Sequence, residues 1–255
     1  MYIDEILEKL LSQKLSLAEA KERLNILSIN YVENIAKLDT YREVRRGIPE
    51  VVFAENKNYT HLVKIILSIM KVKDIVVVSK IRNQDIVRLT REIRKQKMYV
   101  KGGLNCSSLM IYKKVLRKKV DGKVGILCAG TSDIGIAEEA RIMAEAMDCE
   151  TITEYDVGIS GMHRTISATE RLLRQKVRAI IAVAGMEGAL PSVVSSLVNV
   201  PVIGVPTSGS YGFGSGGIGA MTSMLQSCTL GLTIVNIDNG IGAGAFAALI
   251  ARQSR

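Results

Sequence analysis

Three side chains in the second half of the chain carry groups that enzymes use in catalysis. His163, one of only two histidines, lies in the glycine-rich segment 158–164 and is a candidate for moving a proton near neutral pH. Glu187 follows a predicted strand, where a carboxylate either complements a helix dipole or holds a magnesium ion beside a pyrophosphate. The spacing around Cys228 is typical of a small buried apolar residue, and the end of a helix favours its thiol over its thiolate. Chemistry at Cys228 therefore requires a nearby cation.

The loop after the strand predicted at 124–128 has the features of an anion site. Helical spacing resumes over residues 133–147. Gly130 permits close approach of the backbone to a ligand, and the free N–H groups at the start of the helix attract phosphate. The alternative is that Ser132 or Asp133 only caps the helix. These residues alone leave both interpretations open.

Two further features belong to the same half of the chain. Arg164 has a planar fork of donors that suits a phosphate or a carboxylate, with a surface ion pair as the alternative. Segment 206–217 contains five glycines in twelve residues. This composition suits a lid or a close backbone contact with a ligand, or else a disordered connection.

Strands and helices alternate regularly from Lys123 onward. The alternation predicts an α/β domain with a parallel, Rossmann- or flavodoxin-like sheet and helices on both faces. In such sheets ligands bind beyond the carboxyl ends of the strands. The expected strands are 124–128, 151–155, 177–184, 201–205 and 232–237, the helices are 133–147, 165–175, 188–198, 218–227 and 241–251, and the loops at the ligand edge are 129–133, 156–164, 185–191, 206–217 and 238–242.

Charge and glycine content divide the chain into two domains. Residues 1–122 contain 25 Lys and Arg against 14 Asp and Glu, whereas residues 123–255 contain 9 against 11. The second part also holds 18 of the 22 glycines. We therefore expect a basic accessory α/β domain over 1–122 and a catalytic domain over 123–255. In the first we expect helices at 2–12, 16–27, 60–70 and 84–95 and strands at 51–53, 75–79, 98–100 and 109–112, with a capping box at Ser16 and Glu19.

Several classes of protein are disfavoured. The basic first half contains no recognisable nucleic-acid motif, so anionic small molecules are the expected partners rather than nucleic acid. No window approaches the ~18 apolar residues of a membrane span, and the N-terminus does not resemble a signal peptide. Four widely spaced cysteines without a CxxC pair suit reduced thiols. We expect a cytoplasmic protein without membrane partners.

The loops at the ligand edge resemble those of the purine-biosynthetic carboxylases that act on aminoimidazole ribonucleotide. The matching stretches are Thr131-Ser132-Asp133 for the phosphate-side loop, 161–165 for the His-Arg loop, and 184–191 with 201–206 for the third loop and its following strand. The chain departs from that family at 186–188, where the family has a Gly-Gly-Ala-Ala-His run. Cys228 and the basic first domain are further departures.

A closer resemblance, over nearly the whole chain, is to the LarB family of pyridinium-3,5-biscarboxylic acid mononucleotide synthases. Residues 37–42 and 47–51 resemble its front-domain signature, although His is commoner there than Tyr41. Residues 225–228 and 236–240 resemble its tail. This combination of motifs is specific.

The LarB resemblance implies carboxylation of the pyridinium ring of nicotinic acid adenine dinucleotide at C5, with carbon dioxide or bicarbonate as co-substrate. Hydrolysis of the phosphoanhydride then releases AMP, at the start of nickel-pincer cofactor biosynthesis. By the same resemblance, Cys228 adds to the ring, His163 or Asp133 removes the C5 proton, and Glu187 holds Mg²⁺. The implied substrate-binding residues are Gly130, Thr131, Ser132, Gly161, Arg164 and Gly188.

Two rival functions follow from the same residues. An aminoimidazole ribonucleotide carboxylase or mutase leaves Cys228 and residues 1–122 without a role. A nucleotide-binding regulator has the fold but performs no chemistry. Relatives of this fold form higher oligomers through the sheet domain, so the resemblance also implies a homo-octamer assembled through the C-terminal domain.

Overall fold

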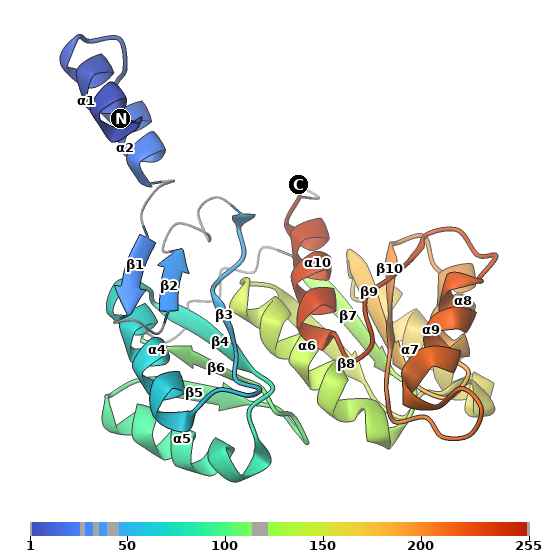
Figure 1. The fold of residues 1–255 in the computed structure, drawn as a ribbon. Coiled ribbons are helices and arrows are strands. Elements are labelled where there is room, and N and C mark those ends of the chain that lie inside the picture. The colour runs from blue at the N-terminus through green and yellow to red at the C-terminus, as the bar shows by residue number, and fades with distance from the viewer. Residues whose placement is uncertain (1, 26–28, 33–35, 40–45, 114–121, 254–255) are drawn as a thin grey trace.

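The computed structural model describes residues 2–25, 29–32, 36–39, 46–113 and 122–253. Besides a two-stranded hairpin, a four-stranded and a five-stranded β-sheet lie side by side in these residues, and helices separate and flank them (Figure 1). The predicted α/β class is therefore confirmed. Residues 40–42 of the front-domain signature lie outside the described residues, whereas 37–39 and 47–51 lie within them.

The chain begins with two short helices, α1 (Tyr2–Leu11) and α2 (Leu17–Asn25). The predicted capping box precedes α2, because the backbone N–H of Ser16 donates to Glu19 (2.8 Å) and that of Glu19 donates to Ser16 Oγ (3.2 Å). An antiparallel hairpin of β1 (Ile29–Val32) and β2 (Ala36–Asp39) follows, which the sequence analysis did not anticipate.

The first sheet has four strands in the order β3-β4-β6-β5, with β3 and β4 parallel and the other pairs antiparallel. Its strands are β3 (Val51–Phe53), β4 (Ile75–Ser79), β5 (Tyr99–Gly102) and β6 (Leu109–Tyr112), and its helices are α4 (Tyr59–Val72) and α5 (Asn83–Lys95). Apolar side chains of α4 and α5, such as Ile66 and Leu89, are buried against Val76 and Val78. These helices thus cover one face of the sheet.

The second sheet has five parallel strands in the order β11-β10-β9-β7-β8, as the alternating pattern predicts. Its strands are β7 (Lys123–Cys128), β8 (Glu150–Glu154), β9 (Ala179–Ala184), β10 (Val202–Pro206) and β11 (Leu232–Ile234), and its helices are α6 (Ile134–Ala146), α7 (Met162–Arg174), α8 (Ala189–Leu197), α9 (Ile218–Leu225) and α10 (Gly240–Gln253). β11 and α9 end two or three residues earlier than the sequence suggests. No helix in the described ranges is long and apolar enough to cross a membrane.

Helices α6 and α10 cover one face of the second sheet, and α7, α8 and α9 cover the other (Figure 1). α6 is therefore placed between the two sheets. The hydrophobic core around this helix includes Val77 and Met110 of the first sheet together with Ile126 and Ile181 of the second. The division at residue 122 stays a prediction, since a shared core joins the two parts.

Glycines allow α10 to pack directly against α6. A Cβ on Gly240 would lie 2.3 Å from the carbonyl oxygen of Ile136, and one on Gly244 would lie 2.4 Å from that of Ala140. Real Cβ atoms do not approach backbone oxygen so closely, so any side chain at these positions must separate the helices.

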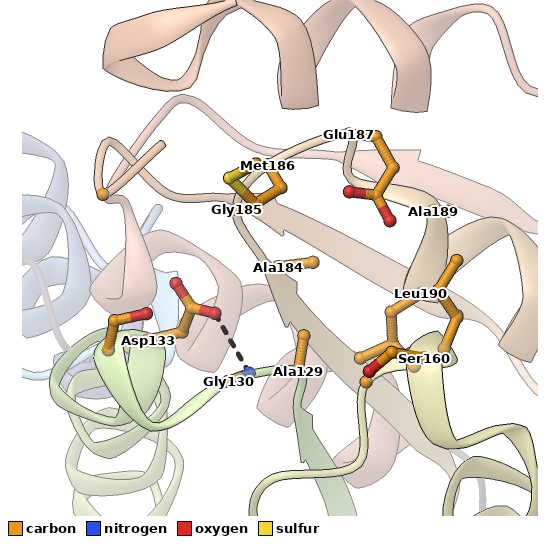
Figure 2. A pocket seen from close by; sticks show the side chains of 14 residues that line it. Ala129, Gly130, Asp133, Ser160, Ala184, Gly185, Met186, Glu187, Ala189 and Leu190 are labelled. Carbon is orange, nitrogen blue, oxygen red and sulfur yellow. Dashed lines mark hydrogen bonds between the residues drawn. The ribbon is translucent and has the colours of Figure 1, made fainter. Parts of the chain in front are cut away.

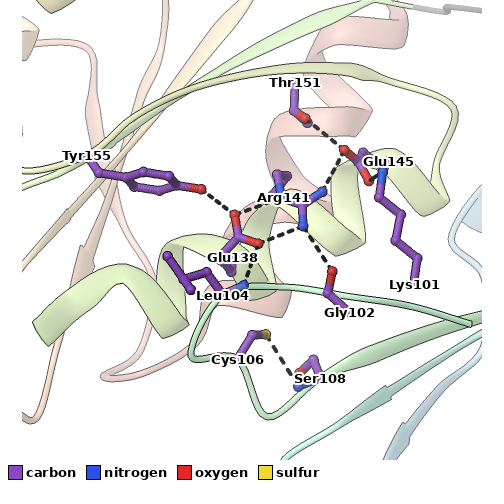
Figure 3. Close-up of polar contacts among 10 residues, drawn as sticks. All are labelled: Lys101, Gly102, Leu104, Cys106, Ser108, Glu138, Arg141, Glu145, Thr151 and Tyr155. Atoms are coloured by element: carbon purple, nitrogen blue, oxygen red, sulfur yellow. Dashed lines mark hydrogen bonds and ion pairs between the residues drawn. The ribbon is translucent and has the colours of Figure 1, made fainter. Parts of the chain in front are cut away.

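A buried network of charged side chains joins α6 to the first sheet (Figure 3). Arg141 donates to both carboxylate oxygens of Glu138 (2.6 and 2.7 Å) and to the carbonyl oxygen of Gly102 (3.2 Å). Burial alone raises the pKa of Glu138, but hydrogen bonds from Arg141 and Tyr155 outweigh it and leave this pKa below its ordinary value. The hydrogen bonds and charges of Glu138 and Glu145 in turn raise the pKa of Arg141. The network supplies partners for charges that would be costly to bury alone.

Glu139, the next residue of α6, is 2% exposed and meets Ser79 of β4 and two serines of the loop between β5 and β6. Its Oε1 accepts hydrogen bonds from Ser108 (2.8 Å), Ser79 (3.2 Å) and Ser107 (3.3 Å). Burial raises the pKa of Glu139 despite these donors. The acidic residues at 138 and 139 therefore bind the two sheets together rather than facing solvent.

We expect Gly244→Ala to lower the free energy of unfolding by about 1–3 kcal/mol, because the added methyl group overlaps the backbone of α6. Urea denaturation monitored by circular dichroism measures this loss. Gly209→Ala is the matched control, since a Cβ there meets nothing within 4 Å. Equal stability of the two variants would contradict the close contact between the helices.

Candidate functional site

A cavity of about 450 Å³ lies beyond the carboxyl ends of β7, β8, β9 and β10, at the edge where parallel sheets bind ligands (Figure 2). Loops after three strands of the sheet, together with Gly209, enclose it. The lining residues are Ala129, Gly130, Ser132, Asp133, Gly158, Ile159, Ser160, Ala184, Gly185, Met186, Glu187, Ala189, Leu190 and Gly209. Figure 2 shows Asp133 and Glu187 on opposite sides of this cavity.

Asp133 is the most firmly held carboxylate of the cavity and is only 5% exposed. Its Oδ2 accepts the backbone N–H of Gly130 (3.2 Å), and its Oδ1 accepts the hydroxyl of Thr207 (2.6 Å). A Cβ on Gly185 would lie 2.8 Å from Thr207 Oγ1, so this arrangement requires a glycine there. The hydrogen bond from Gly130 thus fixes the loop that precedes Asp133, and the remaining lone pairs of this carboxylate are available to a ligand.

Glu187 and Met186 form the opposite wall, in the loop between β9 and α8. Met186 has a φ of +47° and Gly188 a φ of +64°, so this loop turns through the left-handed region twice. Strain of this kind at a non-glycine residue is concentrated at functional sites. A Cβ on Gly188 would meet the carbonyl oxygen of Ala220 at 2.7 Å, so this glycine fixes how α8 approaches α9. The side chain of Glu187 remains exposed.

Glu187 fits a magnesium ion only in combination with a ligand. The described residues contain no group of three or more His, Cys, Asp or Glu side chains that could hold a metal. Mg²⁺ commonly takes one or two carboxylates and completes its shell with water and substrate phosphates. The exposed carboxylate of Glu187 at the cavity wall matches that pattern.

The residues predicted from the His-Arg loop lie beside the cavity rather than in its lining. Gly161 is buried at the start of α7, where a Cβ would lie 2.6 Å from Arg164 Nε. Arg164 forms an ion pair with Asp156, which is the alternative that the sequence left open. His163 is exposed on the first turn of α7. Their roles in ligand binding and proton transfer stay predictions.

Cys228 lies at the opposite edge of the sheet. α9 starts beside the cavity and runs back over eight residues, about 12 Å, before the chain reaches this cysteine. The neighbouring Thr229 accepts a hydrogen bond from Ser195 (2.6 Å), close to the last turn of α8. Gly231 then leads into β11 at its amino end. Within one chain the thiol is therefore remote from Asp133.

The four thiols differ sharply in environment. Burial raises the pKa of Cys106 and of Cys128 to about 12, so neither forms a thiolate at neutral pH. Cys149 is also buried, whereas Cys228 is exposed. The interpretation of Cys228 as a buried apolar residue is therefore wrong, because α9 ends at Leu225 and leaves the following loop at the surface.

Among the sequence-predicted site residues, Gly130, Ser132, Asp133 and Glu187 share the cavity, and Thr131 lines an adjoining one. Ser160, Gly185 and Thr207 are further residues of the site that the sequence pattern does not single out, although all three lie in loops predicted for the ligand edge. Thr207 follows a strand directly, and that position was the available signal. Its contact with Asp133, 74 residues away, is visible only in three dimensions.

Residues 123–255 match the family model of AIR carboxylase, which spans just over half of the chain. The chain belongs to the AIR carboxylase family. In this member, residues 30–105 also match the model of the LarB/PurE-like N-terminal domain. The cavity is thus built from the AIR carboxylase part, whereas β3, β4 and β5 of the first sheet lie within the residues that match the additional domain.

Relatives of this AIR carboxylase family member fall into two groups. An uncharacterized protein of Methanocaldococcus jannaschii is 46% identical over 241 residues, which are 93% of this chain and 92% of that protein. An N5-carboxyaminoimidazole ribonucleotide mutase from the same organism is 32% identical over 50% of this chain and 75% of its own length. The corresponding mutase of Thermotoga maritima is 31% identical over 50% of this chain and 74% of its own length.

The difference among the thiols gives a direct test. We expect one cysteine of the native family member to react rapidly with Ellman's reagent, and all four to react after unfolding in guanidinium. Cys228→Ser should abolish the rapid phase, whereas Cys149→Ser should preserve it. Rapid labelling that survives in Cys228→Ser would contradict the assignment of Cys228 as the accessible thiol.

Proposed function

We propose that this protein carboxylates the pyridinium ring of nicotinic acid adenine dinucleotide at C5 and hydrolyses the phosphoanhydride. The products are pyridinium-3,5-biscarboxylic acid mononucleotide, a nickel-pincer cofactor precursor, and AMP. The observation that carries this proposal is the LarB/PurE-like domain in front of the AIR carboxylase part. The mutase relatives match only half of this chain, and aminoimidazole ribonucleotide chemistry leaves the front half without a purpose.

The substrate explains why this enzyme needs a nucleophile. Aminoimidazole ribonucleotide is an enamine and attacks carbon dioxide unaided, whereas an N-alkyl pyridinium is electron-poor. A thiolate that bonds to C4 pushes an electron pair into the ring and forms a neutral dihydropyridine, in which C5 is nucleophilic. C5 then bonds to carbon dioxide. A base removes the C5 proton, and loss of the thiolate from C4 restores the aromatic pyridinium. No oxidant is required.

Asp133 is placed to act at the ring. Its carboxylate is fixed by Gly130 and Thr207, so its free lone pairs keep one orientation in the cavity. We assign it, or His163 from the neighbouring helix start, the role of accepting the C5 proton. The N–H groups at the start of the Asp133 loop hold the adjoining ribosyl phosphate.

Glu187 serves the second half-reaction. In this proposal its exposed carboxylate would hold Mg²⁺ together with the substrate, and the ion would supply stabilisation of the negative charge that develops during hydrolysis. Water attacks phosphorus, and the bond to the bridging oxygen breaks to release AMP. Gly209 of the glycine-rich segment 206–217 lines the cavity, and we assign this segment the role of excluding bulk water.

In this proposal Cys228 reaches the ring from a second copy of the chain. Its position at the opposite edge of the sheet from Asp133 supports a thiol that enters the cavity of another copy. The side chains of Leu225 and Leu230, which flank it, are 63% and 93% exposed, as expected for a surface that another copy covers. We propose that a homo-octamer, assembled through the C-terminal domain, supplies this thiol.

One observation favours a competing function. The cavity of a single chain contains no thiol, and an aminoimidazole ribonucleotide carboxylase or mutase requires none. Under this alternative Cys228 has no catalytic role. The two functions differ in their substrate and in their dependence on Cys228.

Incubation with nicotinic acid adenine dinucleotide, ¹³C-bicarbonate and magnesium should yield a ¹³C-labelled dicarboxylated mononucleotide and one equivalent of AMP by mass spectrometry. Cys228→Ser should reduce carboxylation at least 1,000-fold, because serine is a far weaker nucleophile near neutral pH. Cys149→Ser is the matched control and should remain active. If Cys228→Ser keeps full activity, or if only aminoimidazole ribonucleotide is carboxylated, the proposed reaction is wrong.

Mixed oligomers test the origin of the thiol. We expect Asp133→Asn and Cys228→Ser, each inactive alone, to regain activity when the two chains are co-expressed and purified together. Restoration occurs because an intact cavity from one chain meets an intact thiol from the other. Failure to regain activity in oligomers shown to contain both chains would place the thiol in its own chain's cavity.

A further inference from the structure

Met186 occupies a strained position on the wall of the cavity. It lies in a tight turn between β9 and α8, which the backbone N–H of Gly188 closes by donating to the carbonyl oxygen of Gly185 (2.8 Å). The φ of Met186 is +47°, and glycine, asparagine or aspartate usually occupies a turn position of this kind. A longer side chain in the left-handed region carries a conformational cost that another contribution must offset.

Packing in the protein interior does not offset this cost. Met186 is 45% exposed and belongs to none of the hydrophobic cores of the described residues. Its side chain instead lines the cavity, on the same wall as Glu187 and across from Asp133 (Figure 2). Strain at a residue that lines a cavity and packs in no core indicates a role toward a ligand.

The lining offers a flat ring few other partners. Among the residues that the structure describes, no aromatic side chain lines the cavity. The other apolar side chains of the lining are shorter or stiffer than methionine, and they belong to Ala129, Ile159, Ala184, Ala189 and Leu190. Methionine has a flexible and polarisable thioether, which makes favourable contacts with aromatic rings. Met186 is therefore the residue of this lining best suited to contact a ring.

We propose that Met186 is a specificity-determining residue, whose thioether covers one face of the pyridinium ring. This inference rests on the proposed function, which places the ring beside Asp133 and the phosphates toward Glu187. A Cβ on Gly185 would lie 3.4 Å from Asp133 Oδ1, and Met186 is the next residue of the chain. Met186 thus borders the position of the ring, and Glu187, which follows it, borders that of the phosphates.

Cover on one face matters because a pyridinium ring is planar and a nucleophile can add to either face. Met186 belongs to the same chain as the cavity, whereas the proposed thiol of Cys228 comes from another copy. A ring that rests on Met186 presents only its opposite face to that thiol. Because the lone pairs of a thioether are electron-rich, this contact also favours an electron-poor ring over an electron-rich one.

Calorimetric titration of the full-length protein with nicotinic acid mononucleotide and with ribose 5-phosphate tests the proposal, because only the first ligand contains the ring. In Met186→Ala we expect the affinity for nicotinic acid mononucleotide to fall about tenfold, from the loss of the thioether contact and of apolar burial. The affinity for ribose 5-phosphate should stay within about twofold. Met186→Leu retains most of the apolar volume and should recover most of the loss. Val72→Ala, at a position on α4 that is 52% exposed, is the matched control and should behave like wild type.

Met186→Gly separates ligand binding from a structural role. Glycine adopts a positive φ without steric cost, so we expect the Tm to stay within about 2 °C of wild type while the affinity for nicotinic acid mononucleotide falls as in Met186→Ala. An equal loss of affinity for both ligands, or no loss for either, would overturn the proposal. Absence of nicotinic acid mononucleotide binding to the wild type would overturn it as well.

The product assay separates this failure from failure of the proposed function. If the labelled dicarboxylate forms but ring affinity does not depend on Met186, the reaction stands and the role of Met186 is wrong. If ring affinity depends on Met186 but no dicarboxylate forms, the cavity binds a pyridinium ring and the proposed reaction is wrong.

Discussion

The position of α6 between two β-sheets is the constraint on which the rest of the structure depends. A helix covered on both sides must bury its polar face as well as its apolar face, and buried charges are tolerated only with close partners. Glu138, Arg141 and Glu139 find those partners in each other and in the first sheet. Without that sheet, Glu139 would lose the serine hydroxyls that donate to it, and Arg141 would lose the carbonyl oxygen of Gly102.

The position of α6 also fixes the geometry of the cavity at the carboxyl ends of the strands. Asp133 stands directly before α6, so the packing that fixes the helix also fixes the carboxylate at the cavity. Thr207 then ties Asp133 to the loop after β10, across a strand order in which β9 separates β7 from β10. Gly185 at the end of β9 provides the space for this contact. Three strands thus cooperate to orient one carboxylate.

The distribution of chemical groups matches the demands of the proposed substrate. The cavity of one chain offers carboxylates, hydroxyls and backbone N–H groups, which suit the phosphate binding and proton transfer of the proposed reaction. Its lining contains no thiol, and the exposed thiol of Cys228 lies at the far edge of the same sheet. The proposed chemistry on an electron-poor ring would therefore couple activity to assembly. A relative that acts on an electron-rich ring has no such requirement.

The sequence by itself determined the parallel sheet, the order of its elements and the loops that carry the site. These follow from local periodicity and from the rule that ligands bind beyond the carboxyl ends of parallel strands. It also placed Asp133 and Glu187 at one edge, because each follows a strand. The sequence does not predict the pairing of β1 with β2, because each strand has four residues and so gives too short a pattern to detect.

Only the tertiary structure decided which residues meet. The acidic pair at 138 and 139 looks like a solvated helix face, and its burial depends on a sheet that is distant in sequence. Thr207 reaches Asp133 only because β7 and β10 flank β9. The separation of Cys228 from the cavity follows from the direction of α9. Periodicity reports which face of an element is apolar, whereas partners across the fold depend on how whole elements pack.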